Sequence, residues 1–300
     1  MAIRKHPVIY GICLVLLLGL VSILLLHGIS ALSGGSSFSS HGKVGIVDVR
    51  GIIASSQEVV EQLDTFRKDD NIQAVVVRID SPGGGVAASQ EIYSAIKELK
   101  KRKKVVASFG SVAASGGYLI ACAADRIVAN PGTITGSVSV IMYFTDAEDL
   151  LKKIGVRASV IKSGKYKDIG SPTREMRADE KEVLQVLVDD IYDQFIDLVA
   201  ADRKIPKSEV KEIADGRVFT GRQAQILKLV DDLGDKAAAI QLAGKMAGLK
   251  GIPETVYARK KDITFWDFLL QQSAGSLADI VKDKIPAIPR GVNLIYEYGL

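Results

Sequence analysis

The sequence predicts an α/β fold in which helices cover a parallel sheet. Its 300 residues are 47% apolar and 25% charged, a composition typical of a globular protein with a sizeable core. From residue 43 onward, short β-branched runs alternate with amphipathic stretches, which is typical of parallel βαβ units. Two of the apolar runs end in glycine-rich turns that lead directly into a helical stretch.

The first half of this region is expected to supply most of the sheet. Strands are predicted at residues 43–49, 74–79, 104–109, 126–128, 137–142 and 157–162. Three helices are expected between these strands. The first starts near Ser56 and has one apolar face, formed by Val59, Val60, Leu63 and Phe66. The second faces inward with Ile92, Ala95, Ile96 and Leu99, and the third covers residues 117–124.

The second half is predicted to be mainly helical. Helical periodicity extends over residues 179–203, 220–227 and 235–249. The first of these stretches is expected to face the core with Val183, Val186, Leu187, Ile191, Phe195 and Leu198. The final stretch, residues 263–300, is apolar and helix-prone, although Pro286 and Pro289 interrupt it. We therefore expect a helical C-terminal part.

The N-terminal segment predicts a transmembrane helix. Residues 8–26 carry no charge, and a helix of that length spans roughly 28 Å, enough to cross a hydrocarbon core. Arg4 and Lys5 precede the run, which predicts a cytoplasmic N-terminus with the body of the chain on the other side. A cleaved signal peptide is the alternative, but the apolar run is long for one and the small residues near Gly28 form a loose cleavage site.

The expected organisation follows from these segments. It comprises a cytoplasmic N-terminus (1–7), a transmembrane anchor (8–30), a Gly/Ser-rich linker (31–42), a folded domain (43–250) and a C-terminal extension (251–300).

Composition excludes several classes of function. Without Arg4 and Lys5 the net charge falls from +4 to +2, which argues against a nucleic-acid binder. All histidines precede residue 42, so the folded domain cannot contain a Ser-His-Asp triad, a Cys-His pair or an imidazole zinc site. Cys13 lies in the apolar run and leaves Cys122 alone, which excludes a disulfide or a cysteine metal cluster in the domain.

The two glycine-rich turns, residues 80–85 and 110–117, are the candidate binding elements. Both follow strands and open helices, where backbone N–H groups can hold an anion. Neither contains a GxxxxGK[ST] or GxGxxG pattern, so a phosphate site is disfavoured relative to an oxyanion site. Ser115 has only small neighbours, which would expose its hydroxyl as a nucleophile, although serines near glycines are more often caps or turn residues.

A nucleophilic serine needs a base, and the domain offers no histidine. A lysine can serve when burial among apolar and hydroxyl groups favours its neutral form. Lys165 and Lys167 both follow the predicted strand 157–162 in a Gly-containing loop. These residues alone leave the choice between them open, and the ordinary interpretation of either lysine is a solvated surface charge.

Three motifs carry a resemblance to a known family. IDSPGGGV (79–86), ASFGSVAASGGYLIACAADRIVANPGTITGSVSV (107–140) and SGKYKDIGSPTREM (163–176) resemble the signal peptide peptidase A family, peptidase family S49, in its short form. The similarity extends over residues 43–247. It implies a Clp-protease/crotonase-like fold of repeated ββα units and a Ser-Lys dyad. It identifies Ser115 as the nucleophile, Lys167 as the general base and Ser137 as the hydroxyl that orients Lys167. Gly116 with Gly84 or Gly83 would form the oxyanion hole.

The resemblance also implies partners and a location. Neighbouring protomers of a homo-oligomeric ring would complete each active site, without a metal or cofactor. The implied function is a serine endopeptidase, anchored in a bacterial inner membrane, that degrades released signal peptides and other unfolded apolar segments. The alternatives are a related protease specific for one membrane protein, a crotonase-like acyl-CoA enzyme, which needs neither Ser115 nor an anchor, and a catalytically silent ring scaffold.

Overall fold

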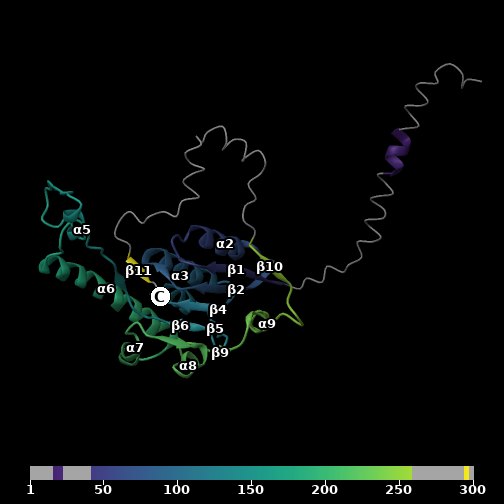
Figure 1. The fold of residues 1–300 in the computed structure, drawn as a ribbon. Helices are drawn as coiled ribbons and strands as arrows, with labels where there is room; N and C mark the ends of the chain where they lie inside the picture. Colours follow the sequence, from purple (N-terminus) through teal and green to yellow (C-terminus); the bar gives the residue numbers. More distant parts are fainter. Residues whose placement is uncertain (1–15, 23–41, 259–293, 297–300) are drawn as a thin grey trace, which may run out of the picture. The chain divides into compact units, whose positions relative to one another are not determined.

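The computed structural model describes residues 16–22, 42–258 and 294–296 (Figure 1). The chain divides into two units, Met1–His41 and Gly42–Leu300. In the first unit, residues 16–22 are helical and exposed, while most of the predicted anchor and linker lies outside the described residues. Within the described part of the chain, every helix falls short of the length and apolar character that crossing a membrane requires.

An eight-stranded sheet forms the centre of the second unit. Its main strands follow the order β10-β1-β2-β4-β5-β9, and every neighbouring pair in that order is parallel. β6 pairs in parallel with the carboxyl-terminal residues of β4 and antiparallel with β8. The strands are β1 (Lys43–Arg50), β2 (Ile72–Ser81), β4 (Lys104–Ala114), β5 (Arg126–Ala129), β6 (Ile134–Gly136), β8 (Val218–Thr220), β9 (Asp232–Leu233) and β10 (Thr255–Tyr257).

Helices cover both faces of this sheet, with α2 and α3 on one side and α9 on the other (Figure 1). β2 is apolar throughout its centre because both of its faces are buried. Val75 and Val77 join the larger core, whereas Ala74 and Val76 pack toward α9. The helices are α2 (Gln57–Lys68), α3 (Val86–Lys100), α4 (Gly116–Cys122), α5 (Glu148–Lys153), α6 (Ala178–Arg203), α7 (Lys207–Ile213), α8 (Gly221–Ile226) and α9 (Lys236–Met246).

A second, three-stranded sheet is built from very short segments. β11 (Leu294–Tyr296) lies between β3 (Gly84–Gly85) and β7 (Ile141–Met142) and runs antiparallel to both. Tyr296 is opposite Gly84 in this register, and Leu294 is opposite Met142. β3 and β7 therefore form the walls of a slot that accepts one extended strand.

Residues 143–187, here called the arm, differ most from the expected structure. The predicted strand at residues 157–162 is wrong: these residues are exposed and irregular, because none of the strands that the structure describes pairs with them. Of the predicted strand 137–142, only 141–142 is a strand, and residues 134–136 form β6 instead. Val183, Val186 and Leu187 are exposed rather than inward, because the first half of α6 extends beyond the core that buries Ile191 and Phe195.

The remaining parallel strands and the helices at α2, α3, α4, α6, α8 and α9 confirm the predicted α/β fold, with bounds that shift by a few residues. The expected helical C-terminal part lies largely outside the described residues, and residues 294–296 of it form a strand.

Candidate active site

Ser115 lies at the junction between β4 and α4, in an unusual backbone conformation. Its φ of 53° and ψ of −119° place a residue with a side chain in a sparsely populated region, which costs about 1–3 kcal/mol and persists only where the surrounding structure imposes it. Only 1% of the residue is exposed. Its Oγ atom is buried without a hydrogen-bond partner among the residues that the structure describes. Such an orphaned hydroxyl on a strained backbone is typical of a functional position rather than a structural one.

The glycines after Ser115 allow α4 to approach the sheet closely. A Cβ atom on Gly117 would lie 3.0 Å from the carbonyl oxygen of Ser81, the last residue of β2. Gly116 begins the helix and is fully buried with the rest of α4. Gly117, two residues after the predicted site serine, thus lies against the carboxyl end of β2, where the first glycine-rich turn begins.

Ser137 leaves the sheet beside Ser115. Ala114 pairs with Gly136 in the β4–β6 ladder, and the Ser115 N–H donates to the Gly136 carbonyl oxygen at 2.8 Å. Ser137 also has a positive φ, 50°, and is 6% exposed, while its N–H donates to the Arg217 carbonyl oxygen at 2.9 Å. The structure therefore brings the predicted nucleophile and the predicted orienting hydroxyl to one place.

The first glycine-rich turn is fixed against Ile53. The N–H of Ile53 donates to the Gly83 carbonyl at 2.9 Å, and the Gly85 N–H donates to the Ile53 carbonyl at 2.8 Å. A Cβ atom on Gly84 would lie 2.5 Å from the Ile53 nitrogen, so this position has room for glycine alone. The Gly83 N–H already donates to Ser81 Oγ at 3.1 Å. β3 in turn lies against α4, so the predicted oxyanion glycines and Ser115 share one region.

Lys167 lies elsewhere in this protomer. It is exposed, in the turn at residues 164–170 of the arm, where its N–H donates to the Gly164 carbonyl at 3.2 Å. Within the residues that the structure describes, no hydrogen bond joins its amine to Ser115 or Ser137. Lys165 has a partner: its amine lies 2.7 Å from the Asp179 carboxylate, and this hydrogen bond raises the pKa of Lys165. The structure thus assembles every predicted site residue except the base.

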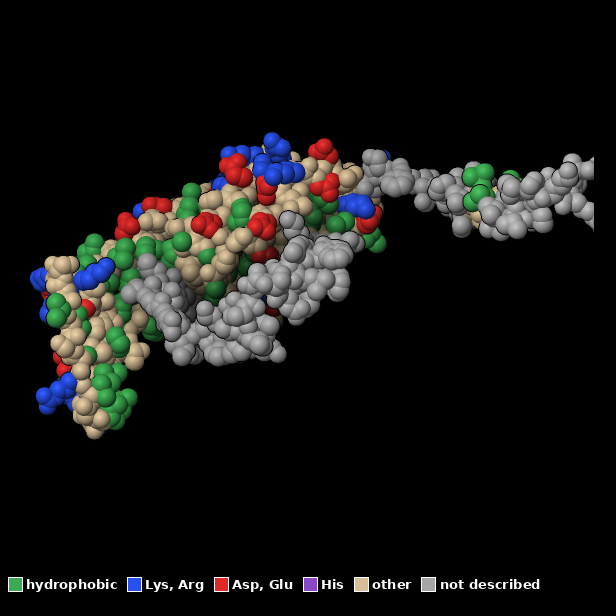
Figure 2. All heavy atoms as spheres, turned by 90° about the horizontal axis from the view of Figure 1, so that it is seen from above, with side chains coloured by type: hydrophobic (Ala, Val, Ile, Leu, Met, Phe, Trp, Pro, Cys, Tyr) green, Lys and Arg blue, Asp and Glu red, His purple; other side chains and the backbone are tan. Residues whose placement is uncertain are grey.

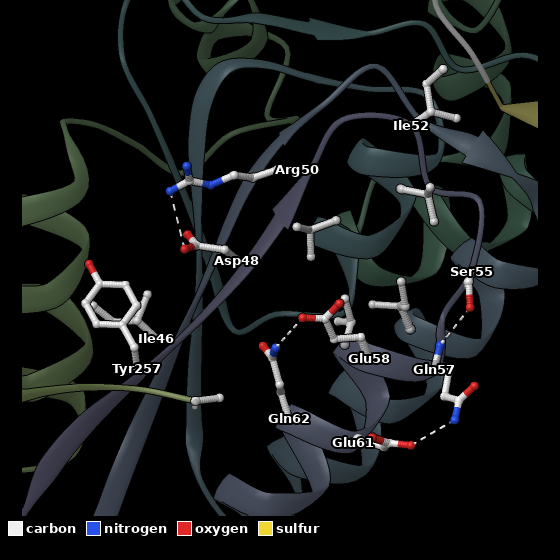
Figure 3. A pocket seen from close by; sticks show the side chains of 15 residues that line it. Ile46, Asp48, Arg50, Ile52, Ser55, Gln57, Glu58, Glu61, Gln62 and Tyr257 are labelled. Carbon is white, nitrogen blue, oxygen red and sulfur yellow. Dashed lines mark hydrogen bonds and ion pairs between the residues drawn. The ribbon is translucent and has the colours of Figure 1, made fainter. Parts of the chain in front are cut away.

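A cavity of about 750 Å³ lies between β1, α2 and β10 and reaches Ile53, the residue that fixes the first glycine-rich turn (Figure 3). Asp48 and Arg50 on β1 form an ion pair of 3.3 Å at its wall, and Tyr257 lines it from β10. Sequence reasoning missed this cavity. The available signal was the alternation of Asp48 and Arg50 with apolar residues along β1, which turns both charged side chains to one face.

The sheet, the strained serine and the glycine turns define an α/β protein with a buried serine at the carboxyl ends of its parallel strands. Comparison with known families agrees, since residues 46–133 match the family model described as Clp protease and residues 97–250 match the one described as Peptidase family S49. The chain belongs to peptidase family S49. It is therefore a serine-type peptidase, and the resemblance seen in its motifs is confirmed.

Individual relatives carry protease names. The chain is 50% identical, over 70% of its length, to a protein of Synechocystis sp. named as a protease, of which the match covers 76%. It is 34% identical over 75% of its length to a protein of Enterococcus faecium named as signal peptide peptidase SppA, with 69% of that protein covered. It is 32% identical over 82% of its length to Protease 4 of Salmonella typhi, of which only 41% is covered.

Proposed function

We propose that this protein is a membrane-anchored serine endopeptidase that degrades released signal peptides and other unfolded apolar segments with a Ser115–Lys167 dyad. The observation that carries the proposal is the buried Oγ of Ser115, which has no hydrogen-bond partner in the described part of the chain and lies on a strained backbone. A hydroxyl that needed only to cap α4 would be hydrogen-bonded, because buried polar groups are costly when left without partners.

Acylation and deacylation use the same three groups: the hydroxyls of Ser115 and Ser137 and the amine of Lys167. Ser115 Oγ attacks the peptide carbonyl carbon while Lys167 takes the hydroxyl proton, which gives a tetrahedral oxyanion. The C–N bond then breaks, Lys167 returns the proton to the leaving amine, and an acyl-enzyme remains. Lys167 next removes a proton from water as the water oxygen attacks the acyl carbon. The ester bond to Ser115 Oγ then breaks, Lys167 returns the proton to that oxygen, and the carboxylic acid product leaves. The Ser137 hydroxyl holds the neutral amine of Lys167 toward Ser115.

Gly84 and Gly116 are the proposed oxyanion donors. Gly83 is the weaker choice because its N–H is already engaged by Ser81 Oγ. Gly84 lies in β3, opposite the strand that occupies the slot, so its peptide group is adjacent to an extended chain at that position. Preorganised N–H groups of this kind stabilise the charge that develops on the substrate oxygen.

The base comes from a second copy of this chain. Lys167 lies on the arm, whose apolar side chains face solvent in the single chain (Figure 2): Tyr143, Leu150, Ile154, Val156, Val160, Ile161, Val183, Val186 and Leu187. An exposed apolar surface of this extent is typical of a subunit interface. A neighbour that covers the arm buries Lys167 as well, which favours the neutral amine that the mechanism needs.

The substrate is bound as an extended strand. β11 occupies the slot between β3 and β7, which demonstrates that a chain segment fits there antiparallel to both walls. An unfolded peptide would add to the same two walls by β-augmentation. The uncharged run at residues 8–26 would hold this site at the outer face of a bacterial inner membrane, where released apolar peptides collect.

Subunit mixing tests the proposal directly. With the full chain and a fluorogenic apolar peptide, Ser115→Ala and Lys167→Ala should each lose activity by at least about 10³-fold, whereas Lys165→Ala should retain it. Mixing the two inactive variants under conditions that exchange subunits should restore part of the activity, because some hybrid sites combine an intact serine with an intact lysine. Activity in either variant alone would contradict the dyad, and a mixture that stays inactive would contradict the shared site.

A further inference from the structure

A cluster of charged side chains holds the turn that carries Lys167 against the start of α6. Arg174 lies at its centre. Its Nη1 and Nη2 atoms donate to the two carboxylate oxygens of Glu180, at 2.8 and 2.6 Å, while Nε donates to Asp168 Oδ2 at 3.0 Å. Asp168 directly follows Lys167 in the chain. One guanidinium group therefore joins the residue next to the proposed base to the first turn of a long helix.

Glu180 is the fixed end of this connection. It has no exposed surface, although it is a carboxylate on the otherwise accessible N-terminal half of α6. The Arg177 N–H also donates to it, at 3.0 Å, and the Arg177 guanidinium lies 2.9 Å away. The hydrogen bonds from Arg174 are the main cause that lowers the pKa of Glu180 to about 2. Because a buried carboxylate is costly without its cations, Glu180 and Arg174 hold each other in place.

Asp168 is neutralised from both sides. Arg174 contacts both of its carboxylate oxygens, and the Lys162 amine also binds Oδ1. These contacts hold the pKa of Asp168 well below its usual range, with Arg174 as the larger cause. The other charged groups that border the cluster are Lys165 with Asp179 on α6, and Glu148 on α5, which accepts from the Glu175 N–H and binds Lys152.

We propose that Arg174 is a positioning residue for the lysine base: it fastens the Lys167 turn to buried Glu180 and cancels the carboxylate charge of Asp168, the next residue in the chain. This inference rests on the proposed role of Lys167. A carboxylate close to an amine stabilises the protonated form, which cannot accept the proton of Ser115. Arg174 also donates from Nη2 to the backbone carbonyl oxygen of Asp168, at 3.2 Å, and so helps to shape the turn. With Arg174 present, the Asp168 carboxylate does not act as a counter-ion for Lys167.

The test compares the pH–rate profile of the full chain with those of Arg174→Gln and a matched arginine variant, Arg177→Gln. Arg177 binds the same Glu180 but does not contact Asp168. We expect Arg174→Gln to lower kcat at pH 7 about tenfold with KM within about twofold, and to move the acid limb of the profile up by about one pH unit. Arg177→Gln should leave the acid limb in place.

A double variant separates positioning from general stability. Asp168→Asn added to Arg174→Gln removes the uncovered charge, so the acid limb should return toward that of the wild type even though the turn has lost a further contact. If Arg174→Gln keeps the wild-type kcat and acid limb, or if the double variant fails to shift the limb back, the inference is wrong. Failure of the dyad itself would look different, since Lys167→Ala would then remain active.

Discussion

The Ser115 N–H donates to the carbonyl oxygen of Gly136, the residue before Ser137, so the two serines leave neighbouring strands at the same point with the same left-handed twist of φ. The backbone of the sheet therefore fixes the positions of both Cβ atoms, which carry the two hydroxyl groups. The proposed role of Ser137, to orient the amine of Lys167, rests on this fixed position.

Ser137→Ala should lower kcat by about tenfold while KM changes by less than twofold, because it removes a group that orients the base rather than one that binds substrate. Ser139→Ala is the control, since Ser139 lies two residues further on and is partly exposed. Steady-state kinetics on a fluorogenic peptide would measure kcat and KM for both variants. Equal losses in both variants would assign the effect to local structure instead.

Gly84→Ala should reduce kcat by about 10²–10³-fold, the effect of losing one oxyanion donor. The added Cβ would collide with the backbone of Ile53, and the peptide group of Gly84 would have to move. Gly132→Ala provides the comparison, because a Cβ there meets nothing within 4 Å. Near-normal turnover by Gly84→Ala would remove this glycine from the proposed oxyanion hole.

Deleting residues 294–300 should raise kcat/KM for short peptides several-fold, because β11 occupies the slot between β3 and β7. A synthetic peptide of the deleted sequence should inhibit the shortened chain competitively. Ile295→Pro should mimic the deletion, since proline removes a backbone donor from the strand. An unchanged kcat/KM in both variants would show that β11 does not compete with substrate.

Acidification should release the arm before the core unfolds. The pKa of Glu180 is lowered to about 2 from an ordinary value of 4.5, so its contribution to stability is complete above about pH 4.5 and is lost as the pH falls toward 2. Limited proteolysis of residues 163–177 with an acid-active protease should accelerate over that window. In Glu180→Gln the rate should already be high at pH 6, and a pH-independent rate in the wild type would contradict the assignment.

Cys122 should resist alkylation in the folded protein. Burial is the main cause that raises the pKa of its thiol to about 12, so only about one molecule in 10⁴ carries the reactive thiolate at pH 8. In a Cys13→Ser background, iodoacetamide should label Cys122 only after denaturant is added. Rapid labelling under native conditions would mean that α4 opens readily.

Much of the central architecture could be predicted because burial on both faces leaves a strong pattern. The apolar run in β2 and the small residues around Ser115 follow from sheet and helix packing that local sequence reflects. The slot escaped prediction because β3 and β7 are two residues each, too short to show a period of alternation.

The arm was misjudged for a related reason. Residues 157–162 have strand character and Val183, Val186 and Leu187 have helical spacing, but their apolar side chains are exposed in the structure. The patterns do not record whether an apolar surface is buried within the same chain. For Lys167, the residue pattern alone did not separate it from Lys165, whereas the family resemblance already implied that neighbouring protomers would complete each site.

The slot between β3 and β7 has one further consequence. A chain that enters it must offer hydrogen-bonding groups along both edges of its backbone, one for each wall. A strand inside a folded protein has already used at least one edge in its own sheet, and a helix has used its backbone groups internally. As the proposed substrate site, the slot would therefore exclude segments whose backbone groups are already paired within a folded protein.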